Sequence, residues 1–411
     1  MTIILDELLA PTAIKYKEER LEFLKHLAQQ LGVDSWQIPV ISVTGTNGKG
    51  STVAALRAIY QHAGYKVGTF TSPHLLRVNE RIAVNGAVVS DTDLNVLANY
   101  LRTTIDIYSL SWFEALFLMA LVYFKTQQLD VIILEVGMGG RLDAINILDA
   151  SLVIITNVEL DHQDYLGTTR EAIAFEKAGL FRHQQVAIFA DNNCPQSVKQ
   201  HCTGTLKLFG EDYNCSLQAE GWSLYFGGQE IHLPFPKVHV SAMSAAIYAS
   251  HMLVNRLPVT CSNWRRANET VFIPGRFQEI DNVVAAKIIL DVGHNPHAAE
   301  LLSSRLPKIT GKIHCIFSVL KDKEKHEMIK IMSKDSLLWY PCTLNVDRAS
   351  SADEMSQLFA GITDVIYSSP REAFSYVESI AAHDDCIVVF GSFYIVEAIM
   401  RILIERGYNV F

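Results

Sequence analysis

The sequence predicts two α/β domains in series, of which the first is a doubly wound parallel sheet. Three observations lead to this fold class. Short apolar runs alternate with helix-like stretches through both halves of the chain. A glycine-rich turn at residues 45–51 joins the first of these runs directly to a helix-like stretch. A Pro274-Gly275 break then precedes a fresh series of elements, and 411 residues exceed what one core usually holds, so we expect domains at residues 1–274 and 275–411.

The individual elements follow from β-branched runs, helix caps and turn residues. In the first domain the expected buried parallel strands are Val40 to Val43, Lys66 to Phe70, Val131 to Val136, Leu152 to Asn157 and Val186 to Ala190. The expected helices include Ser111 to Lys125, Thr168 to Leu180 and one that begins at a cap in Ser90-Asp91-Thr92-Asp93. Short polar runs over residues 206–233 predict a β-rich appendage ahead of a helix at Met243 to Val254. The strands expected in the second domain are Lys287 to Leu290, Ile313 to Val319 and Cys386 to Phe390.

Composition narrows the class of protein. Hydrophobic residues make up 49% of the chain, but no uninterrupted apolar run approaches the roughly 18 to 20 residues that cross a bilayer. The start of the chain lacks the features of a secretory signal, and the seven cysteines are scattered without a C-x-x-C pair, so we expect a soluble cytoplasmic protein with reduced thiols. The net charge of −9 opposes nonspecific binding of nucleic acid. We expect a monomer with neither nucleic-acid nor membrane partners.

The segment Gly45-Thr46-Asn47-Gly48-Lys49-Gly50-Ser51 predicts a phosphate-binding loop. Its glycines allow backbone N–H groups to turn toward an anion at a helix start, Lys49 supplies a positive charge, and Ser51 offers a hydroxyl to Mg²⁺. The spacing is unusual, because Val43 stands where the general pattern has glycine and Gly50 follows the lysine. The alternative is a glycine turn that only changes chain direction.

Further polar residues follow the ends of the next predicted strands, where open α/β sheets bind their ligands. Glu135 ends a strand too apolar to be exposed, so its carboxylate needs either Mg²⁺ or an ion pair with Arg141. Asp161-His162 follows the next strand, and taken alone this histidine is more often structural than a ligand. The loop after the second strand, Thr71 to Ile82, contains hydroxyls, an imidazole and arginines, and a solvated connector is its alternative interpretation.

The second half repeats this arrangement. Arg276 lies at the predicted hinge, where it either clamps a nucleotide or forms an ion pair between the domains. Asp291 and His294 directly follow a strand, and Gly391-Ser392-Phe393 follows the last one. Gly391-Ser392-Phe393 is a strand-to-helix turn at the same sheet edge, and turns of this kind often only change the direction of the chain.

Taken in order, these segments resemble the folate branch of the Mur ligase superfamily, the bacterial dihydrofolate synthases and folylpolyglutamate synthases. The resemblance covers nearly the whole chain and includes Thr71-Ser72-Pro73-His74-Leu75, Glu176-Lys177-Ala178-Gly179 and His294-Asn295-Pro296-His297 besides the segments quoted above. It implies a P-loop ATP-binding domain of Mur ligase type that also binds folate, followed by a smaller Rossmann-like glutamate ligase domain. The chain departs from the family pattern over Ile14 to Arg20 and near His239, where an adenine-contacting asparagine is expected.

The resemblance also implies an activity and a role for each matched residue. The reaction is ATP-dependent addition of L-glutamate to dihydropteroate and to reduced folates through an acyl phosphate. The implied catalytic residues are Lys49, Glu135, His162 and Lys177, of which Lys177 matches a lysine that is carbamylated in this family. Implied contacts with ATP come from Thr46, Asn47, Gly48, Lys49, Gly50, Ser51, Arg276, Asp291 and His294. Implied ligands of Mg²⁺, at two sites, are Ser51, Ser72, Glu135 and His162. Implied substrate contacts are Ser72, His74, Arg77, Phe113, Leu142, Asp143 and Ala144.

Three alternative activities stay open at this stage. A folylpolyglutamate synthase would extend folates without using dihydropteroate. A cell-wall Mur-type ligase would use UDP-linked acceptors, although its motif usually lacks the glycine between Lys49 and Ser51. A nucleotide-dependent switch would use the loop without ligating anything, which leaves Glu135, His162 and Lys177 unexplained.

Overall fold

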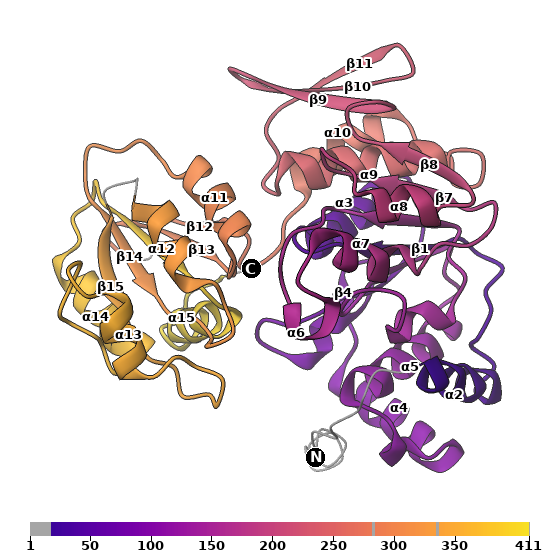
Figure 1. The fold of residues 1–411 in the computed structure, drawn as a ribbon, viewed down its shortest axis with the longest axis horizontal. Helices are drawn as coiled ribbons and strands as arrows, with labels where there is room; N and C mark the ends of the chain where they lie inside the picture. The colour runs from indigo at the N-terminus through magenta and orange to yellow at the C-terminus, as the bar shows by residue number, and fades with distance from the viewer. Residues whose placement is uncertain (1–17, 282–283, 334–336, 411) are drawn as a thin grey trace. The chain divides into compact units, whose positions relative to one another are not determined.

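The computed structural model describes residues 18–281, 284–333 and 337–410. The chain divides into two compact units, Met1–Phe272 and Ile273–Phe411 (Figure 1). This division lies beside the Pro274-Gly275 break. The part of the expected departure over Ile14 to Arg20 that precedes Glu18 lies outside the described residues.

The first unit is built on an eight-stranded sheet in the order β4-β3-β2-β5-β1-β6-β7-β8. Neighbouring strands from β2 to β8 run parallel, whereas β3 and β4 form an antiparallel edge. All five expected strands of this domain are confirmed within a few residues, because their aliphatic side chains are buried on both faces of the sheet. The strands are β1 (Val40–Thr44), β2 (Val67–Phe70), β3 (Ile82–Val84), β4 (Ala87–Val88), β5 (Val131–Glu135), β6 (Leu152–Ile155), β7 (Val186–Phe189) and β8 (Thr205–Leu208).

Helices surround this sheet, and two of the predicted helix starts have side-chain caps. The Ser111 hydroxyl accepts a hydrogen bond from the backbone N–H of Glu114, and the Ser90 hydroxyl accepts one from Asp93, which confirms both expected helix starts. The helices are α2 (Glu18–Gln30), α3 (Lys49–His62), α4 (Asp91–Thr104), α5 (Trp112–Lys125), α6 (Gln163–Leu166), α7 (Arg170–Ala178), α8 (Gln196–His201), α9 (Val240–Met252) and α10 (Cys261–Thr270). Single 3₁₀ turns form η1 (Val78–Arg81), η2 (Ile107–Ser109) and η3 (Ala144–Ile147).

The β-rich appendage is smaller than expected. Its antiparallel strands are β9 (Tyr213–Gln218), β10 (Gly221–Phe226) and β11 (Gln229–Leu233), in the order β11-β10-β9. The expectation that it begins at residue 206 is wrong, because β8 pairs parallel with β7 and extends the main sheet. As an edge strand β8 is only partly buried, so its sequence looks as polar as that of the appendage.

The second unit contains a five-stranded sheet in the order β12-β13-β16-β14-β15, parallel except for β12. The three strands expected here are confirmed as β13 (Lys287–Asp291), β14 (Ile313–Phe317) and β16 (Cys386–Phe390). The others are β12 (Gln278–Ile280) and β15 (Leu338–Pro341). The helices are α11 (Pro296–Arg305), α12 (Lys325–Met332), α13 (Ala352–Leu358), α14 (Pro370–Ile380) and α15 (Phe393–Glu405). This arrangement agrees with the Rossmann-like architecture expected for this part of the chain.

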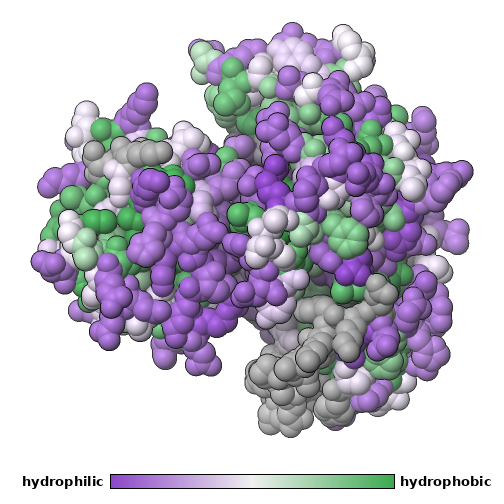
Figure 2. Space-filling view, viewed as in Figure 1, coloured by the Kyte–Doolittle hydropathy of each residue, from purple (hydrophilic) through white to green (hydrophobic). Residues whose placement is uncertain are grey.

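The visible surface of both units is mostly hydrophilic, with hydrophobic side chains in smaller groups (Figure 2). Among the described helices, none combines the length and the apolar character needed to cross a bilayer.

Candidate active site

The candidate site of the first unit lies at the carboxyl edge of its three central strands. The sheet order places β5, β1 and β6 side by side, with Val43 opposite Glu135 and Thr44 opposite Ile155. The loops that follow these strands therefore meet, although Thr46 after β1 and Asn157 after β6 lie 111 residues apart in the sequence. The strand-end motifs of the sequence thus follow three neighbouring strands of the sheet.

The loop after β1 has the backbone of an anion-binding turn. Gly48 adopts a φ of 80° directly before α3, and Gly45 adopts a φ of 146°. A Cβ atom at Gly45 would overlap the Thr156 hydroxyl, so this position requires glycine. Because α3 starts immediately after the loop, its first N–H groups and its dipole favour an anion there.

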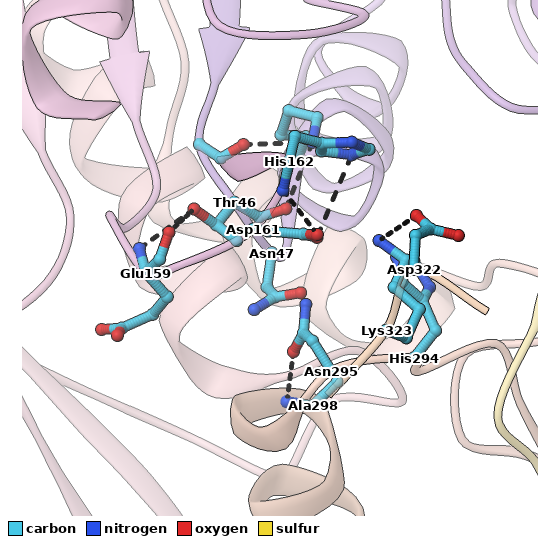
Figure 3. A network of polar contacts seen from close by, with 12 residues as sticks. Thr46, Asn47, Glu159, Asp161, His162, His294, Asn295, Ala298, Asp322 and Lys323 are labelled. Carbon is cyan, nitrogen blue, oxygen red and sulfur yellow. Dashed lines mark hydrogen bonds and ion pairs between the residues drawn. The ribbon is translucent and has the colours of Figure 1, made fainter. Parts of the chain in front are cut away.

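A residue that the motif does not include holds this loop in place. The Asn157 side-chain oxygen accepts hydrogen bonds from the backbone N–H groups of Thr46, at 3.1 Å, and Asn47, at 2.9 Å. The Thr46 hydroxyl donates to the Glu159 carbonyl at 3.1 Å and accepts from its N–H at 3.0 Å (Figure 3). Sequence reasoning treated Asn157 only as the end of a strand. A polar Thr-Asn pair that ends a buried strand was the available signal.

Lys49 folds back over the same loop. Its ammonium donates hydrogen bonds to the carbonyls of Gly45, at 3.1 Å, and Thr46, at 3.2 Å. Ser51 is buried in the first turn of α3. The positive charge of Lys49 also affects the pKa values of two other expected site residues, Asp143 and Lys177. Lys49 therefore lies among the expected site residues of the first unit.

The Glu135 carboxylate lies at the meeting point of three motifs. It is 4% exposed, it accepts a hydrogen bond from the Ser72 backbone N–H at 3.0 Å, and a Cβ at Gly50 would lie 3.5 Å from its Oε2. Its charge also opposes the burial that lowers the pKa of the Arg81 guanidinium to about 10. Arg141, the alternative partner, forms an ion pair with Glu176 at 2.9 Å. The Glu135 carboxylate therefore lies between the Ser72 segment and the glycine that follows Lys49.

Lys177 is a buried lysine with a perturbed pKa. Its side chain lies on α7 and is 2% exposed. Burial, followed by the positive charge of Lys49, lowers its pKa to about 7, and the nearby carboxylates of Asp161 and Asp143 oppose this shift. The neutral amine is therefore well populated near neutral pH, which an exposed lysine does not achieve.

Asp143 and Phe113 lie together against the turn after β5. The Asp143 carboxylate accepts hydrogen bonds from the backbone N–H groups of Met138, at 2.9 Å, and Ile145, at 3.0 Å. Burial nevertheless raises the pKa of Asp143 to about 6. A Cβ at Gly137 would meet both the Phe113 ring and the Asp143 carboxylate, so the two side chains are neighbours. The residues flanking Asp143, Leu142 and Ala144, are partly buried and buried respectively.

His162 is less enclosed than the other expected metal ligands. It adopts a left-handed φ of 51° before α6, its side chain is 41% exposed, and its Nε2 lies 4.0 Å from Asp161 Oδ2 (Figure 3). Within the described part of the chain, no group of three or more histidine, cysteine, aspartate or glutamate side chains could hold a metal ion. Mg²⁺ usually keeps several waters and takes one or two carboxylates together with substrate phosphates, so it does not need such a group.

The two arginines of the loop after β2 differ in their burial and in their partners. The expected substrate ligand Arg77 is exposed and pairs with Asp91 at 2.7 Å. Arg81 is buried instead, where its Nε donates to His74 Nδ1 at 2.9 Å and its guanidinium lies 4.1 Å from the centre of the Trp112 ring. The buried cation of this loop is therefore Arg81.

The second unit brings its own motifs together at one sheet edge. Asp291, at the end of β13, accepts hydrogen bonds from the backbone N–H groups of Phe277, at 2.8 Å, and Gly293, at 2.7 Å. The N–H of Gly391, after β16, donates to the Gly293 carbonyl at 3.1 Å. Burial is the main cause of a raised Asp291 pKa, which the positive charge of Arg276 opposes.

Aromatic contacts complete this second cluster. The Arg276 guanidinium lies 5.2 Å from the centre of the Phe393 ring, and the ring of His294 lies 6.0 Å from it. The Asn295 side chain caps α11 by accepting a hydrogen bond from the Ala298 N–H at 2.9 Å (Figure 3). The three expected nucleotide contacts of the second unit, Arg276, Asp291 and His294, are therefore held in one local cluster.

Comparison with known families decides the classification. The family model described as "Mur ligase middle domain" matches residues 43–263, and that described as "Mur ligase, glutamate ligase domain" matches residues 275–393. The chain belongs to the Mur ligase family. Among its curated Mur ligase relatives, the dihydrofolate synthase/folylpolyglutamate synthase of Escherichia coli (strain K12) is 35% identical over 393 residues, 94% of this chain and 92% of the relative. The protein of the same name from Buchnera aphidicola subsp. Schizaphis graminum is 34% identical, over 95% of this chain and 94% of the relative.

Solved structures agree with this placement in the Mur ligase family. E. coli FolC in complex with DHPP and ADP superposes with a TM-score of 0.90 at 34% identity, covering 98% of this chain and 97% of that one. A bifunctional folylpolyglutamate synthase/dihydrofolate synthase with Mn, AMPPNP and L-glutamate bound has a TM-score of 0.89 at 34% identity, covering 97% of each chain.

Proposed function

We propose that this chain is an ATP- and divalent-metal-dependent ligase that joins L-glutamate to dihydropteroate and to reduced folates. The observation that carries this proposal is the edge formed by β5, β1 and β6. There a phosphate-binding loop, the buried Glu135 carboxylate and the Ser72 loop lie together. The two curated relatives described above align over most of their length, and both are named dihydrofolate synthase/folylpolyglutamate synthase. We assign nucleotide and folate binding to residues 1–274 and glutamate ligation to residues 275–411.

The nucleotide fits the loop at the start of α3. The proposed contacts in the first unit are the backbone N–H groups of residues 46–51 and the ammonium of Lys49. In the second unit, the proposed contacts are Arg276, Asp291 and His294.

A divalent cation fits the donors near this loop. Glu135 is a buried carboxylate beside the Ser72 segment and the glycine of the phosphate loop, and a carboxylate is a ligand that Mg²⁺ takes together with substrate phosphates. We propose Ser51, Ser72, Glu135 and His162 as the residues that hold Mg²⁺ at two sites, with phosphate oxygens and water completing each shell. When bound, the metal neutralises charge on the transferring phosphoryl oxygens.

The acceptor fits the turn after β5. Phe113 offers a ring for stacking on a flat pterin, and Asp143 offers a carboxylate that two backbone N–H groups hold in place. Leu142 and Ala144 supply the adjoining surface, and His74 and Arg77 lie on the loop that we propose to adjust between acceptors of different length.

The chemistry follows from charge and position. The acceptor carboxylate attacks the γ-phosphorus of ATP, and ADP leaves. The amine of glutamate then attacks the acyl carbon, forms the amide bond and displaces phosphate. Lys49 and the loop N–H groups stabilise negative charge on the phosphoryl group that moves. We further propose that the Lys177 amine carries CO₂ as a carbamate, because its lowered pKa favours the neutral amine that this modification requires.

The test is an acceptor panel with labelled glutamate. Purified protein is incubated with ATP, Mg²⁺ and either dihydropteroate, tetrahydrofolate or a UDP-linked muropeptide, and both ADP release and labelled product are measured. We expect glutamate-dependent product with dihydropteroate and with the reduced folate, and none with the muropeptide. Extension of tetrahydrofolate without use of dihydropteroate would restrict the enzyme to polyglutamate synthesis and would contradict the Phe113 pocket assignment.

A further inference from the structure

A partly buried ion pair joins α2 to the first turn of α5. Arg20 Nε donates a hydrogen bond to Glu114 Oε1 at 2.8 Å, and the second arm of the guanidinium donates to Oε2. The side chains are 19% and 8% exposed, and 94 residues separate them in the sequence. A two-point contact between guanidinium and carboxylate fixes the relative orientation of both groups, which a single-point contact does not.

The same carboxylate also shapes the start of α5. Glu114 Oε2 accepts a hydrogen bond from the Ser111 N–H at 2.7 Å, and the Ser111 hydroxyl accepts one from the Glu114 N–H at 3.3 Å. This reciprocal arrangement is a capping box, which sets where and at what angle the helix begins. Arg20 therefore acts on the capping residue of α5 rather than on an arbitrary point along the helix.

The two residues between Ser111 and Glu114 carry rings toward the proposed acceptor site. Trp112 lies under the buried guanidinium of Arg81, and Phe113 lies against the turn that holds Asp143. Both rings belong to the helical turn that the capping box defines, so a rotation of that turn moves both of them.

A second contact joins α2 to the segment that follows Asp143. The helix packs on η3, which begins directly after Asp143. Leucines of α2, including Leu24 and Leu27, share one hydrophobic core with α5 and η3. The helix thus contacts both segments that we assign to the acceptor, and Arg20 is its charged link to one of them.

We propose that Arg20 is a positioning residue for the acceptor. Through Glu114 it fixes the first turn of α5, and this turn sets the positions of Trp112 and Phe113 and hence the affinity for the pterin end of the substrate. The inference rests on the proposed function, because the acceptor is assigned there. Arg20 lies outside the motifs named above. We expect it to affect the binding of the acceptor and not the binding of the nucleotide.

The test compares Arg20→Met with Arg20→Lys. We expect Arg20→Met to raise the KM for dihydropteroate by roughly ten- to a hundredfold, since small displacements of positioning groups have effects of this size. The Kd for ADP, measured by calorimetry, should stay within about twofold. Arg20→Lys should give an intermediate KM, because an ammonium keeps the charge but loses the two-point geometry. Lys25→Met, an exposed substitution on the same helix, is the matched control and should leave both parameters unchanged.

Folding and function are separated by further measurements. If Arg20→Met is unstable because Glu114 is left as an unpaired buried charge, Arg20→Met/Glu114→Gln removes that charge and keeps an acceptor for the Ser111 N–H. We expect this double variant to fold and to retain the raised KM. An unchanged acceptor KM in a folded variant, or an equal loss of acceptor and ADP binding, would overturn the positioning role. An inactive wild-type protein with dihydropteroate would instead overturn the proposed function.

Discussion

Replacement of Lys177 by alanine tests the most unusual charge in the first unit. Burial and the charge of Lys49 lower the pKa of Lys177 to about 7 from its ordinary value of 10.5. At pH 8 the amine is then about nine-tenths neutral, whereas an exposed lysine is roughly 0.3% neutral. The form that reacts with CO₂ is thus about 300-fold more abundant than at an exposed lysine. Carbamylation forms a bond between this nitrogen and the carbon of CO₂, releases a proton and turns a neutral amine near Lys49 into an anion.

The expected result is loss of ligation with partial chemical rescue. Lys177→Ala removes the proposed anion, and we expect turnover to fall on the order of 10²-fold, the size of effect seen when one electrostatic group is removed from an active site. Added formate or acetate should restore part of the turnover by placing a carboxylate in the space that the side chain vacates. The assay is ADP release with dihydropteroate and glutamate at pH 8. Lys199→Ala, on the exposed side of α8, is the matched control and should retain full turnover.

A direct measurement separates carbamylation from a simple structural role. Protein equilibrated with ¹³C-labelled CO₂ should show a carbamate signal by nuclear magnetic resonance that is absent from Lys177→Ala. Full activity of Lys177→Ala, or a wild-type protein that is active without any such signal, would refute the reasoning. Loss of activity without rescue and with a lowered melting temperature would assign Lys177 to the core instead.

Three further predictions concern the same edge of the sheet. Lys49→Ala should lower turnover on the order of 10²-fold or more without changing the melting temperature; a variant that keeps over half of the wild-type turnover would contradict the assignment. Glu135→Gln should require more Mg²⁺ for half-maximal activity, because the amide lacks the charge that attracts the ion, and an unchanged Mg²⁺ titration would return Glu135 to an ion-pair role. The raised pKa of Asp143, about 6, means that the carboxylate protonates as the pH falls through 6, so the wild-type kcat/KM for the acceptor should fall about tenfold per pH unit below it. Because the folded protein holds this proton more tightly, the wild-type free energy of unfolding should also decrease by roughly 2 kcal/mol from pH 4 to 6 relative to Asp143→Asn, and equal slopes would contradict the raised pKa.

The strands and the loop motifs could be predicted from the sequence because their signals are local. The β16 run, Cys386–Phe390, matches its predicted bounds, since an apolar run this short is typical of a buried strand and Gly391 marks its end. The edge strand β8 was wrongly predicted as part of the β-rich appendage. Its residues are only partly buried, so they do not show the apolar run of a central strand. The same limit applies to the loop after β2, where Arg77 and Arg81 differ in burial but not in chemistry.

What the sequence by itself determined is the order of elements, the phosphate loop and the set of strand-end residues. These depend on backbone propensity, glycine conformations and the rule that parallel strands gather their carboxyl ends. Only the tertiary structure decided which groups share an environment. The lowered pKa of Lys177 depends on burial and on a lysine from another element, and the pairing of Arg20 with Glu114 joins helices 94 residues apart. Burial and long-range contact are properties of packed side chains, which no local pattern specifies.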